Sequence, residues 1–212
     1  MQKKINILLF SLVFALLLFI LVSNNQIKLY RKKFTFLDKN IVVNIYSKNS
    51  NLSNKALNKI EKIYNLSKDD LYVTTKKANK VLKDLKIKNY LINAQGNIIV
   101  GSHYENDYYK VGLENPNIVD DVFKIIKIKN KSIVSLINES SIDNGVRYFE
   151  GNYKGIYVIS NDLVKSKKIA TILLDKDIEE GKKYIEELKD VDAIWFLFDD
   201  TIINSSGIKS YE

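Results

Sequence analysis

The polar residues whose types and spacing could bind a ligand gather in one short segment between two apolar runs. Asn93, Gly96 and Asn97 separate Tyr90-Leu91-Ile92 from Ile98-Ile99-Val100. A turn of this kind can present backbone N–H groups and side-chain amides to a bound molecule. A plain hairpin turn between two strands is the simpler interpretation of the same residues. The pattern alone leaves both interpretations open.

The chain lacks most of the side chains on which strong catalytic and metal-binding motifs depend. It contains no cysteine and a single histidine, His103. This excludes disulfide scaffolds, thiolate zinc sites, cysteine nucleophiles and multi-histidine metal sites. No phosphate-binding loop, dinucleotide fingerprint or paired-histidine helix is present, and His103, in a polar segment, is assigned no role. Any chemistry must use carboxylates, hydroxyls, amides, lysines or backbone groups.

The excess of positive charge belongs to the amino-terminal flank. The 212 residues contain 33 lysines and arginines against 25 aspartates and glutamates, a net charge of +8. Six of the basic residues lie within residues 1–33, which hold no acidic residue, so the rest of the chain carries 27 against 25. A nearly neutral domain lacks the basic surface expected of a nucleic-acid-binding protein. The sequence therefore predicts no nucleic-acid partner.

The amino terminus has the composition of a membrane-spanning helix. Residues 5–27 contain no charged side chain and are apolar over most of their length. The run satisfies the roughly 20-residue length that a spanning helix needs. A cleaved signal peptide is the alternative, for which Ser23 and the Asn24-Asn25 pair are the cleavage-site candidates. We predict that residues 1–27 form an uncleaved transmembrane signal anchor.

The domain boundaries and the side of the membrane follow from this anchor. Residues 28–33 are predicted to be a basic juxtamembrane linker and residues 34–212 one domain, since about 150 residues per domain is usual. More basic residues stand after the apolar run than before it, which argues against export under the positive-inside rule. A short basic tail followed directly by an apolar run is nevertheless how exported chains begin. We predict a single-pass protein of the cell membrane with an extracytoplasmic domain.

Hydrophobic periodicity predicts strands interspersed with helices, which is typical of an α+β fold. Residues 34–37 and 41–46 are predicted to form a hairpin. Ser53 is predicted to cap a first helix, and a second helix begins near Thr75. Further strands are predicted at residues 90–92, 98–100, 108–113, 123–128, 132–136, 146–149, 156–159, 193–198 and 201–204, and a third helix at 178–188.

Five short motifs follow one another along the predicted domain. Residues 90–101 are Y-L-I-N-A-Q-G-N-I-I-V-G, and Y-Y-K-V-G-L-E-N-P follows at 108–116. I-A-T-I-L-L at 169–174 precedes E-E-G at 179–181 and S-S-G at 205–207. In this order they resemble the N-x-G-G-N-I flavin-site turn, the W-x-V-G-I-x-x-P strand, the D-A-x-x-T helix, the E-x-G helix start and the closing S-x-G strand of one family. It is the family of FAD:protein FMN transferases, also called the ApbE or thiamine-biosynthesis lipoprotein family.

The resemblance implies a fold, an activity and a set of binding residues. The fold would be a single ApbE-like (T-fold-like) α+β domain with a mostly antiparallel sheet and flanking helices. The activity would be transfer of FMN from FAD to a serine or threonine of a redox protein, with FAD or FMN as the flavin and magnesium as the metal. The cofactor-binding residues carried over are Asn93, Gly96, Asn97, Lys167 and Thr171. No catalytic residue is assigned.

One departure from the family pattern changes the chemistry expected of the site. The family's magnesium site is built partly from the aspartate and threonine of D-A-x-x-T. Thr171 matches the threonine, but Lys167 stands at the aspartate position, and a lysine ammonium cannot ligate a metal ion. Gln95 also replaces the first glycine of the G-G pair. We therefore predict that the magnesium site is lost and that the chain is a degenerate, flavin-binding or accessory homologue, and we leave its enzymatic activity open.

Two other functions fit the same elements. An extracytoplasmic ligand-sensing domain of the Cache kind would suit a membrane helix and an α+β domain, although it needs a second spanning helix and no comparable apolar run follows Val22. A purely structural interaction domain would bind no small molecule. The expected partners of a transferase homologue are the membrane and flavin-carrying membrane redox proteins. Retained FAD binding separates it from the structural alternative.

Overall fold

A single antiparallel sheet organises the molecule. The computed structural model describes residues 26–118, 121–137, 139–143, 146–149 and 153–212. Within these residues, eight strands form one sheet in the order β1-β2-β3-β4-β7-β10-β11-β12, and every neighbouring pair is antiparallel. The strands are β1 (Lys28–Phe36), β2 (Lys39–Ser47), β3 (Tyr90–Ala94), β4 (Asn97–Val100), β7 (Ser132–Ile137), β10 (Gly155–Ser160), β11 (Asp192–Phe196) and β12 (Ile202–Asn204).

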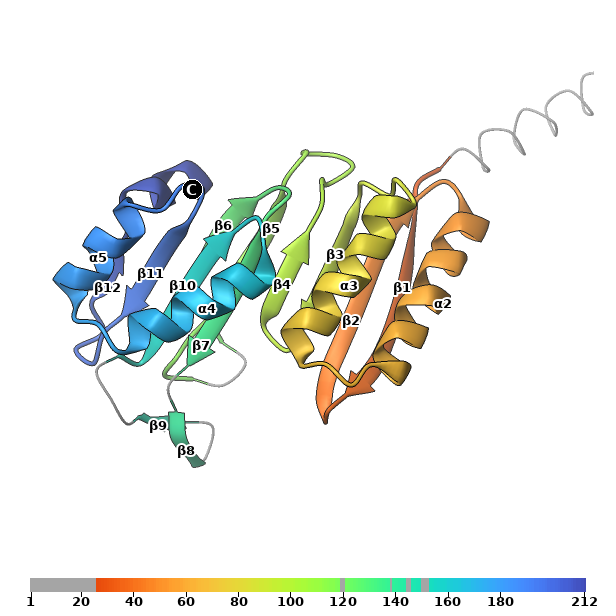
Figure 1. Ribbon diagram of the computed structural model, residues 1–212. Coiled ribbons are helices and arrows are strands. Elements are labelled where there is room, and N and C mark those ends of the chain that lie inside the picture. The colour runs from red at the N-terminus through yellow and green to blue at the C-terminus, as the bar shows by residue number, and fades with distance from the viewer. Residues whose placement is uncertain (1–25, 119–120, 138, 144–145, 150–152) are drawn as a thin grey trace, which may run out of the picture.

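Four helices cover one face of this sheet (Figure 1). They are α2 (Ser50–Leu66), α3 (Leu71–Asp84), α4 (Leu163–Leu174) and α5 (Ile178–Glu186). Helix α2 packs on β1 and β2, α3 on β3, α4 on β7 and β10, and α5 on β11. The other face carries the hairpin β5 (Tyr109–Glu114) and β6 (Val122–Ile128) with the 3₁₀ helix η1 (Ser206–Tyr211), while β8 (Glu139–Asp143) and β9 (Val146–Phe149) form a separate hairpin. The predicted α+β class with a mostly antiparallel sheet is confirmed.

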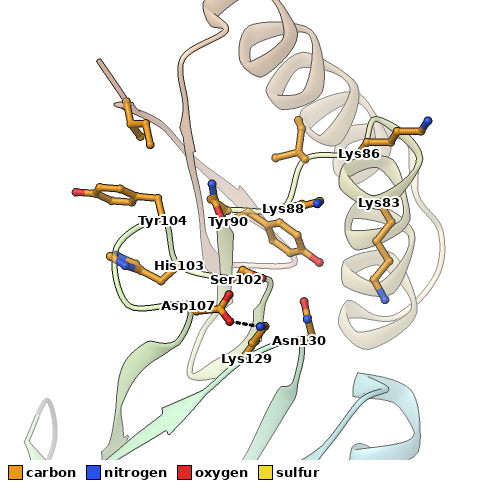
Figure 2. Close-up of a pocket in the computed structure, with 13 residues that line it drawn as sticks. Lys83, Lys86, Lys88, Tyr90, Ser102, His103, Tyr104, Asp107, Lys129 and Asn130 are labelled. Atoms are coloured by element: carbon orange, nitrogen blue, oxygen red, sulfur yellow. Dashed lines mark hydrogen bonds and ion pairs between the residues drawn. The ribbon is translucent and has the colours of Figure 1, made fainter. Parts of the chain in front are cut away.

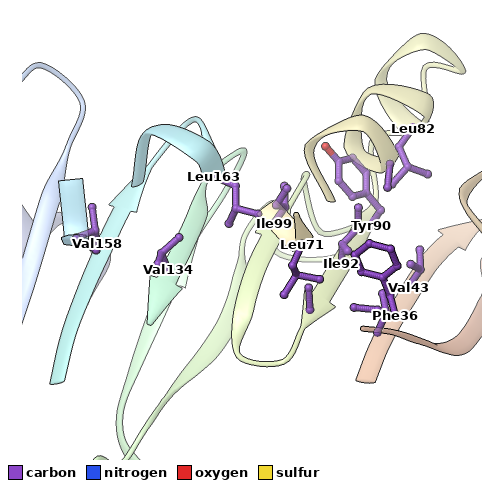
Figure 3. Close-up of a cluster of buried hydrophobic side chains, with 14 of the residues drawn as sticks. Phe36, Val43, Leu71, Leu82, Tyr90, Ile92, Ile99, Val134, Val158 and Leu163 are labelled. Carbon is purple, nitrogen blue, oxygen red and sulfur yellow. The ribbon is translucent and has the colours of Figure 1, made fainter. Parts of the chain in front are cut away.

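The sheet is buried on both faces, which gives the molecule two apolar layers. On β10, Val158 joins the layer beneath the helices, and its neighbour Tyr157 joins the layer beneath the β5–β6 hairpin. The same alternation occurs on β11, where Trp195 and Ile194 point to opposite layers. The helix-side layer is one cluster that extends from Phe36 on β1 to Trp195 on β11, and Figure 3 shows the part of it between Phe36 and Val158. Each fully buried aliphatic or aromatic side chain contributes ~1.5–3 kcal/mol.

Two helices begin earlier than the sequence predicted. Helix α2 is capped by Asn49, whose side chain accepts from the backbone N–H of Leu52 at 2.9 Å. Ser53, the predicted cap, instead lies in the first turn and donates to the Asn49 carbonyl at 2.8 Å. Helix α3 is capped by Asp70 and so starts four residues before Thr75. The first turn of α2, at residues 50–53, is mostly polar and shows little apolar stripe, so the cap defines its start. The first turn of α3, at residues 71–74, consists of apolar, aromatic and β-branched residues, a composition that favours a strand in the sequence alone.

Two segments have a secondary structure other than the one that the sequence predicted. The linker predicted at residues 28–33 is wrong, because β1 begins at Lys28 and pairs with β2 along its whole length. Charged residues on an edge strand discourage pairing with other chains, and they give it the composition of a linker. The S-S-G motif at 205–207 was predicted to lie in a closing strand, but β12 ends at Asn204 and Ser206 starts η1.

Residues 1–25 of the predicted signal anchor lie outside the described residues, which begin at residue 26. Among the residues that are described, no helix is long and apolar enough to cross a membrane.

The connections place two groups of residues at opposite ends of the sheet. The β1–β2 turn and the β3–β4 turn share one end, where the Gln95 N–H donates to the Asn40 carbonyl at 3.2 Å. We call this the turn end. Helix α3 starts there and leads to the other end, where the Tyr46 N–H donates to the Asn89 carbonyl at 2.9 Å. The described chain enters at this second end, at the start of β1, and we call it the entry end.

Candidate functional site

The turn between β3 and β4 is a tight, two-residue turn that requires left-handed backbone. Gln95 has φ +49° and Gly96 has φ +81°, the signature of a type I′ hairpin turn. Asn93 supports the turn from within, because its Oδ1 accepts from the Gly96 N–H at 2.9 Å. The side chain of Asn93 is therefore committed to the turn, and Gly96 supplies a conformation that glycine adopts without strain.

Asn97 follows the turn and has an unused acceptor. Its side chain is only 5% exposed, and its Nδ2 donates to the carbonyls of Ala94 and Gln95 at 3.2 and 3.4 Å. These two bonds fix the amide orientation and direct Oδ1 away from the turn. Oδ1 finds no donor among the described residues. A buried acceptor left in this state costs ~1–3 kcal/mol, which a donor brought to Oδ1 would recover. Because Oδ1 exposes less than 1 Å², a neighbouring side chain must move aside before a ligand can reach it.

Lys167 on α4 lies in the same region, and Tyr72 connects it to Asn97. The Lys167 Nζ stands 5.2 Å from the centroid of the Tyr72 ring. Tyr72 lies in the first turn of α3, and burial is the main reason why its pKa is raised, with Asp70 adding to the shift and the Asn97 amide opposing it. Helices α3 and α4 pack against each other. The fold thus brings together two residues that are 70 positions apart in the sequence.

Lys167 is a partly buried cation with no carboxylate close to it. Its pKa is lowered, first by burial and then by the charge of Lys39, while Asp70 raises it. Asp70 is itself used as the cap of α3, where it accepts from the Val73 N–H at 2.8 Å. Among the described residues, no carboxylate lies within 4 Å of the Lys167 ammonium. An anion near Lys39 and Lys167 would stabilise both charges.

Thr171 lies one turn further along α4 and is exposed. Its Oγ1 donates to the carbonyl of Lys167 at 3.0 Å, so the hydroxyl is engaged within its own helix. No described hydrogen bond joins it to the β3–β4 turn. The five predicted binding residues therefore divide into Asn97 and Lys167, which meet at Tyr72, Asn93 and Gly96, which shape the turn, and Thr171, which stands apart.

Sequence reasoning missed Tyr72, Lys39 and Asp70. Lys39 lies at the start of β2, Asp70 is the N-cap of α3, and Tyr72 lies in the first turn of α3. None of the three belongs to a recognisable sequence motif. Their proximity follows from the packing of α3 on α4 and from the shared turn end, which a single sequence does not reveal.

The donor set around Lys167 suits an anion and does not suit a divalent cation. Magnesium takes oxygen ligands in near-octahedral geometry, whereas the group that occupies this position is an ammonium. Within the described part of the chain, no group of three or more histidine, aspartate or glutamate side chains lies together where a metal ion could be held. The residues found around Lys167 therefore lack the carboxylates that a divalent cation takes as ligands.

Comparison with known proteins identifies the family. The family model described as the ApbE family matches residues 73–195, more than half of the chain. The chain belongs to the ApbE family. The matched segment contains the β3–β4 turn and Lys167, whereas Lys39, Asp70 and Tyr72 lie before it. Among curated proteins, none matches the chain.

Solved ApbE structures share the fold of this ApbE-family chain. The flavin transferase ApbE from Vibrio cholerae is 9% identical with a TM-score of 0.64, and the match covers 88% of this chain and 100% of that one. The ApbE protein from Thermotoga maritima is 11% identical with a TM-score of 0.68, covering 87% and 99%. The flavinyl transferase ApbE from Pseudomonas stutzeri is 10% identical with a TM-score of 0.65, covering 88% and 98%. The fold is retained although few residues are.

Proposed function

We propose that this protein is a membrane-anchored, extracytoplasmic homologue of FAD:protein FMN transferase that binds flavin without magnesium. Membership of the ApbE family supports a flavin ligand. Residues 1–27 would hold the chain in the membrane, close to flavin-carrying membrane redox proteins. In this proposal the chain is degenerate as a transferase and serves as a flavin-binding or accessory protein.

The observation that carries the proposal is the pair formed by Lys167 and Asn97 around Tyr72. The ammonium of Lys167 has no carboxylate within 4 Å among the described residues, and the buried Oδ1 of Asn97 has no donor. FAD offers both complements, because its pyrophosphate is anionic and its ribityl hydroxyls and ring imide can donate. In a purely structural domain the Lys167 ammonium would keep only its contact with the Tyr72 ring, and Asn97 Oδ1 would stay without a donor.

The magnitude of the lysine contact separates binding from catalysis. One unit charge at 4 Å from a phosphate is worth ~4 kcal/mol at an effective dielectric constant of about 20. A single ammonium can therefore hold a phosphate. Cleavage of the pyrophosphate also requires stabilisation of the charge that develops in the transition state and orientation of the attacking hydroxyl, which a divalent ion supplies in metal-assisted transfer. Lys167 provides one charge at one place, so binding without full transferase activity follows.

The test is a titration of the full-length chain in detergent with FAD, with and without magnesium, followed by calorimetry. We expect binding that magnesium does not strengthen. Lys167→Ala should weaken it at least tenfold, because the phosphate loses its principal cation. Lys168→Ala is the matched control, since it removes a lysine from the adjacent, exposed position of α4 and should leave the affinity unchanged.

Three other outcomes of this titration would contradict the proposal. Binding that depends on magnesium would restore the metal-dependent transferase and would refute the role given to Lys167. Equal affinities for the two alanine variants would remove Lys167 from the site. No binding of FAD at all would favour a scaffold that contacts other proteins.

A further inference from the structure

A second site lies at the entry end of the sheet, away from the β3–β4 turn. It is an open pocket of about 760 Å³ between the end of α3, the start of β3 and the loops after β4 and β6. The residue that lines it at the beginning of the described chain is Ile27. The pocket thus lies beside the point where the chain passes from residues 1–25 into the domain.

The pocket is strongly basic for its size. Its lining contains four lysines, Lys83, Lys86, Lys88 and Lys129, and one carboxylate, Asp107. Asp107 is paired with Lys129, which leaves three lysines without a carboxylate within 4 Å among the described residues. All three are exposed, and they occupy one side of the pocket (Figure 2).

The opposite side of the pocket is aromatic and apolar. Figure 2 shows Tyr104 and His103 on the far side of the pocket from Lys83 and Lys86, with their rings directed away from the lysines. Tyr104 is 38% exposed and stacks on Tyr46 with ring centroids 5.2 Å apart. Leu29 on β1 and Ile27, which immediately precedes β1, are 49% and 37% exposed. Exposed apolar and tyrosine side chains beside unpaired lysines are the composition that proteins present to a bilayer surface.

We propose that this pocket docks on the bilayer by binding anionic lipid head groups. The three lysines would contact head-group phosphates, and Ile27, Leu29 and Tyr104 would enter the interfacial layer. Each lysine close to an anionic membrane surface contributes ~1 kcal/mol, a factor of about five in the docking equilibrium. The inference rests on the membrane attachment in the proposed function, but it requires no flavin binding.

Docking of the entry end determines where the candidate flavin site stands. The nine-residue β1 spans the sheet from the entry end to the turn end, a length of ~30 Å at about 3.3 Å per residue. With the pocket on the bilayer, the β3–β4 turn would face away from the membrane at about that height. There it would be open to the extramembrane part of a partner protein.

The test uses the absence of cysteine from the chain. The full chain is reconstituted in nanodiscs, with one fluorophore on Asn106→Cys at the pocket loop or on Asn65→Cys at the turn end of α2. Spin-labelled lipid quenches a fluorophore that touches the bilayer. We expect quenching at position 106 but not at position 65, only with anionic lipid, and released by salt because the contact is electrostatic.

The variant that tests the lysines is Lys83→Gln/Lys86→Gln/Lys88→Gln. It should shift the docking equilibrium about a hundredfold towards the undocked state. The matched control, Lys55→Gln/Lys59→Gln/Lys62→Gln, removes three exposed lysines from α2 and should retain quenching. Equal quenching in nanodiscs of zwitterionic lipid, or equal loss in both triple variants, would overturn the proposal. Release of the full chain from nanodiscs by salt alone would instead refute the membrane anchor of the proposed function. FAD titration of the same variants reports on the flavin site separately.

Discussion

At position 167 a lysine ammonium stands where the resemblance to the family pattern predicts a carboxylate, and the residues around it suit a cation that binds an anion. Lys39 adds a second positive charge nearby, and the carboxylate of Asp70 is engaged in capping α3. The lowered pKa of Lys167 means that burial and the charge of Lys39 disfavour its protonated form. An anionic ligand would remove this cost, because it supplies the missing counter-charge.

The pH dependence of FAD binding tests Lys167 directly. The folded pKa of Lys167 lies below the ordinary value of about 10.4, so the ammonium is fully present near neutral pH and is lost as pH rises through that lowered pKa. Affinity should therefore fall at a lower pH than an ordinary lysine would give. Lys167→Arg keeps its charge beyond pH 12 or so and should shift the fall upwards. Calorimetry between about pH 7 and about pH 10 should show the fall for the unmodified chain and none for the arginine variant. Identical profiles for the two proteins would exclude Lys167 as the titrating group.

Among the elements, the β3–β4 hairpin has the strictest local requirements. Its turn needs positive φ at two successive positions, and the chain provides glutamine and glycine. Glutamine is less suited to this conformation than asparagine or glycine, so the first position is held by the pairing of β3 with β4 and by the bond from Gln95 to Asn40. Asn93 and Asn97 then complete the turn from both sides.

Substitutions in this turn should have opposite effects on stability. Gly96→Ala should lower the free energy of unfolding by ~1–2 kcal/mol, the cost of a left-handed alanine, because the added Cβ would meet its nearest atom at 3.6 Å and so adds no clash. Gln95→Asn should raise it by up to about 0.5 kcal/mol. Urea denaturation measures both changes. A neutral Gly96→Ala would show that the turn adopts another conformation in solution.

At the scale of the whole molecule, one continuous apolar cluster on the helix side connects most strands of the sheet. It contains residues from β1, β2, β3, β4, β7, β10 and β11 and from the helices above them. Trp195 is fully buried within it and lies against α5, where a Cβ added at Gly181 would come within 3.3 Å of the indole ring. Because no break divides this apolar cluster into two parts, the domain is expected to unfold in one cooperative transition.

Two probes at distant places should therefore report one transition. Trp195 is the only tryptophan of the chain, and a fluorophore on Asn65→Cys reports on α2 at the other side of the sheet. We expect the same urea midpoint from both signals. A lower midpoint for the α2 probe would mean that the β1–β3 half unfolds on its own, and would separate the candidate site from part of its support.

The sequence by itself determined the fold class, the order of most strands and the family, because hydrophobic periodicity and motif order are local properties of the chain. It also singled out Asn97 and Lys167. It misplaced the starts of α2 and α3, because Asn49 and Asp70 are recognised as caps only from the hydrogen bonds that they make. It assigned residues 28–33 to a linker, because an edge strand with charged side chains lacks the apolar pattern of a buried strand.

Only the tertiary structure decided which residues share a site. The packing of α3 on α4 brings Tyr72 between Asn97 and Lys167, and it leaves Thr171 bonded to its own helix. The same structure places the lysines at the end of α3 beside Ile27, at the opposite end of the sheet. These associations join residues far apart in the chain, and they arise from the burial of apolar faces between layers, which fixes distances that no local pattern encodes.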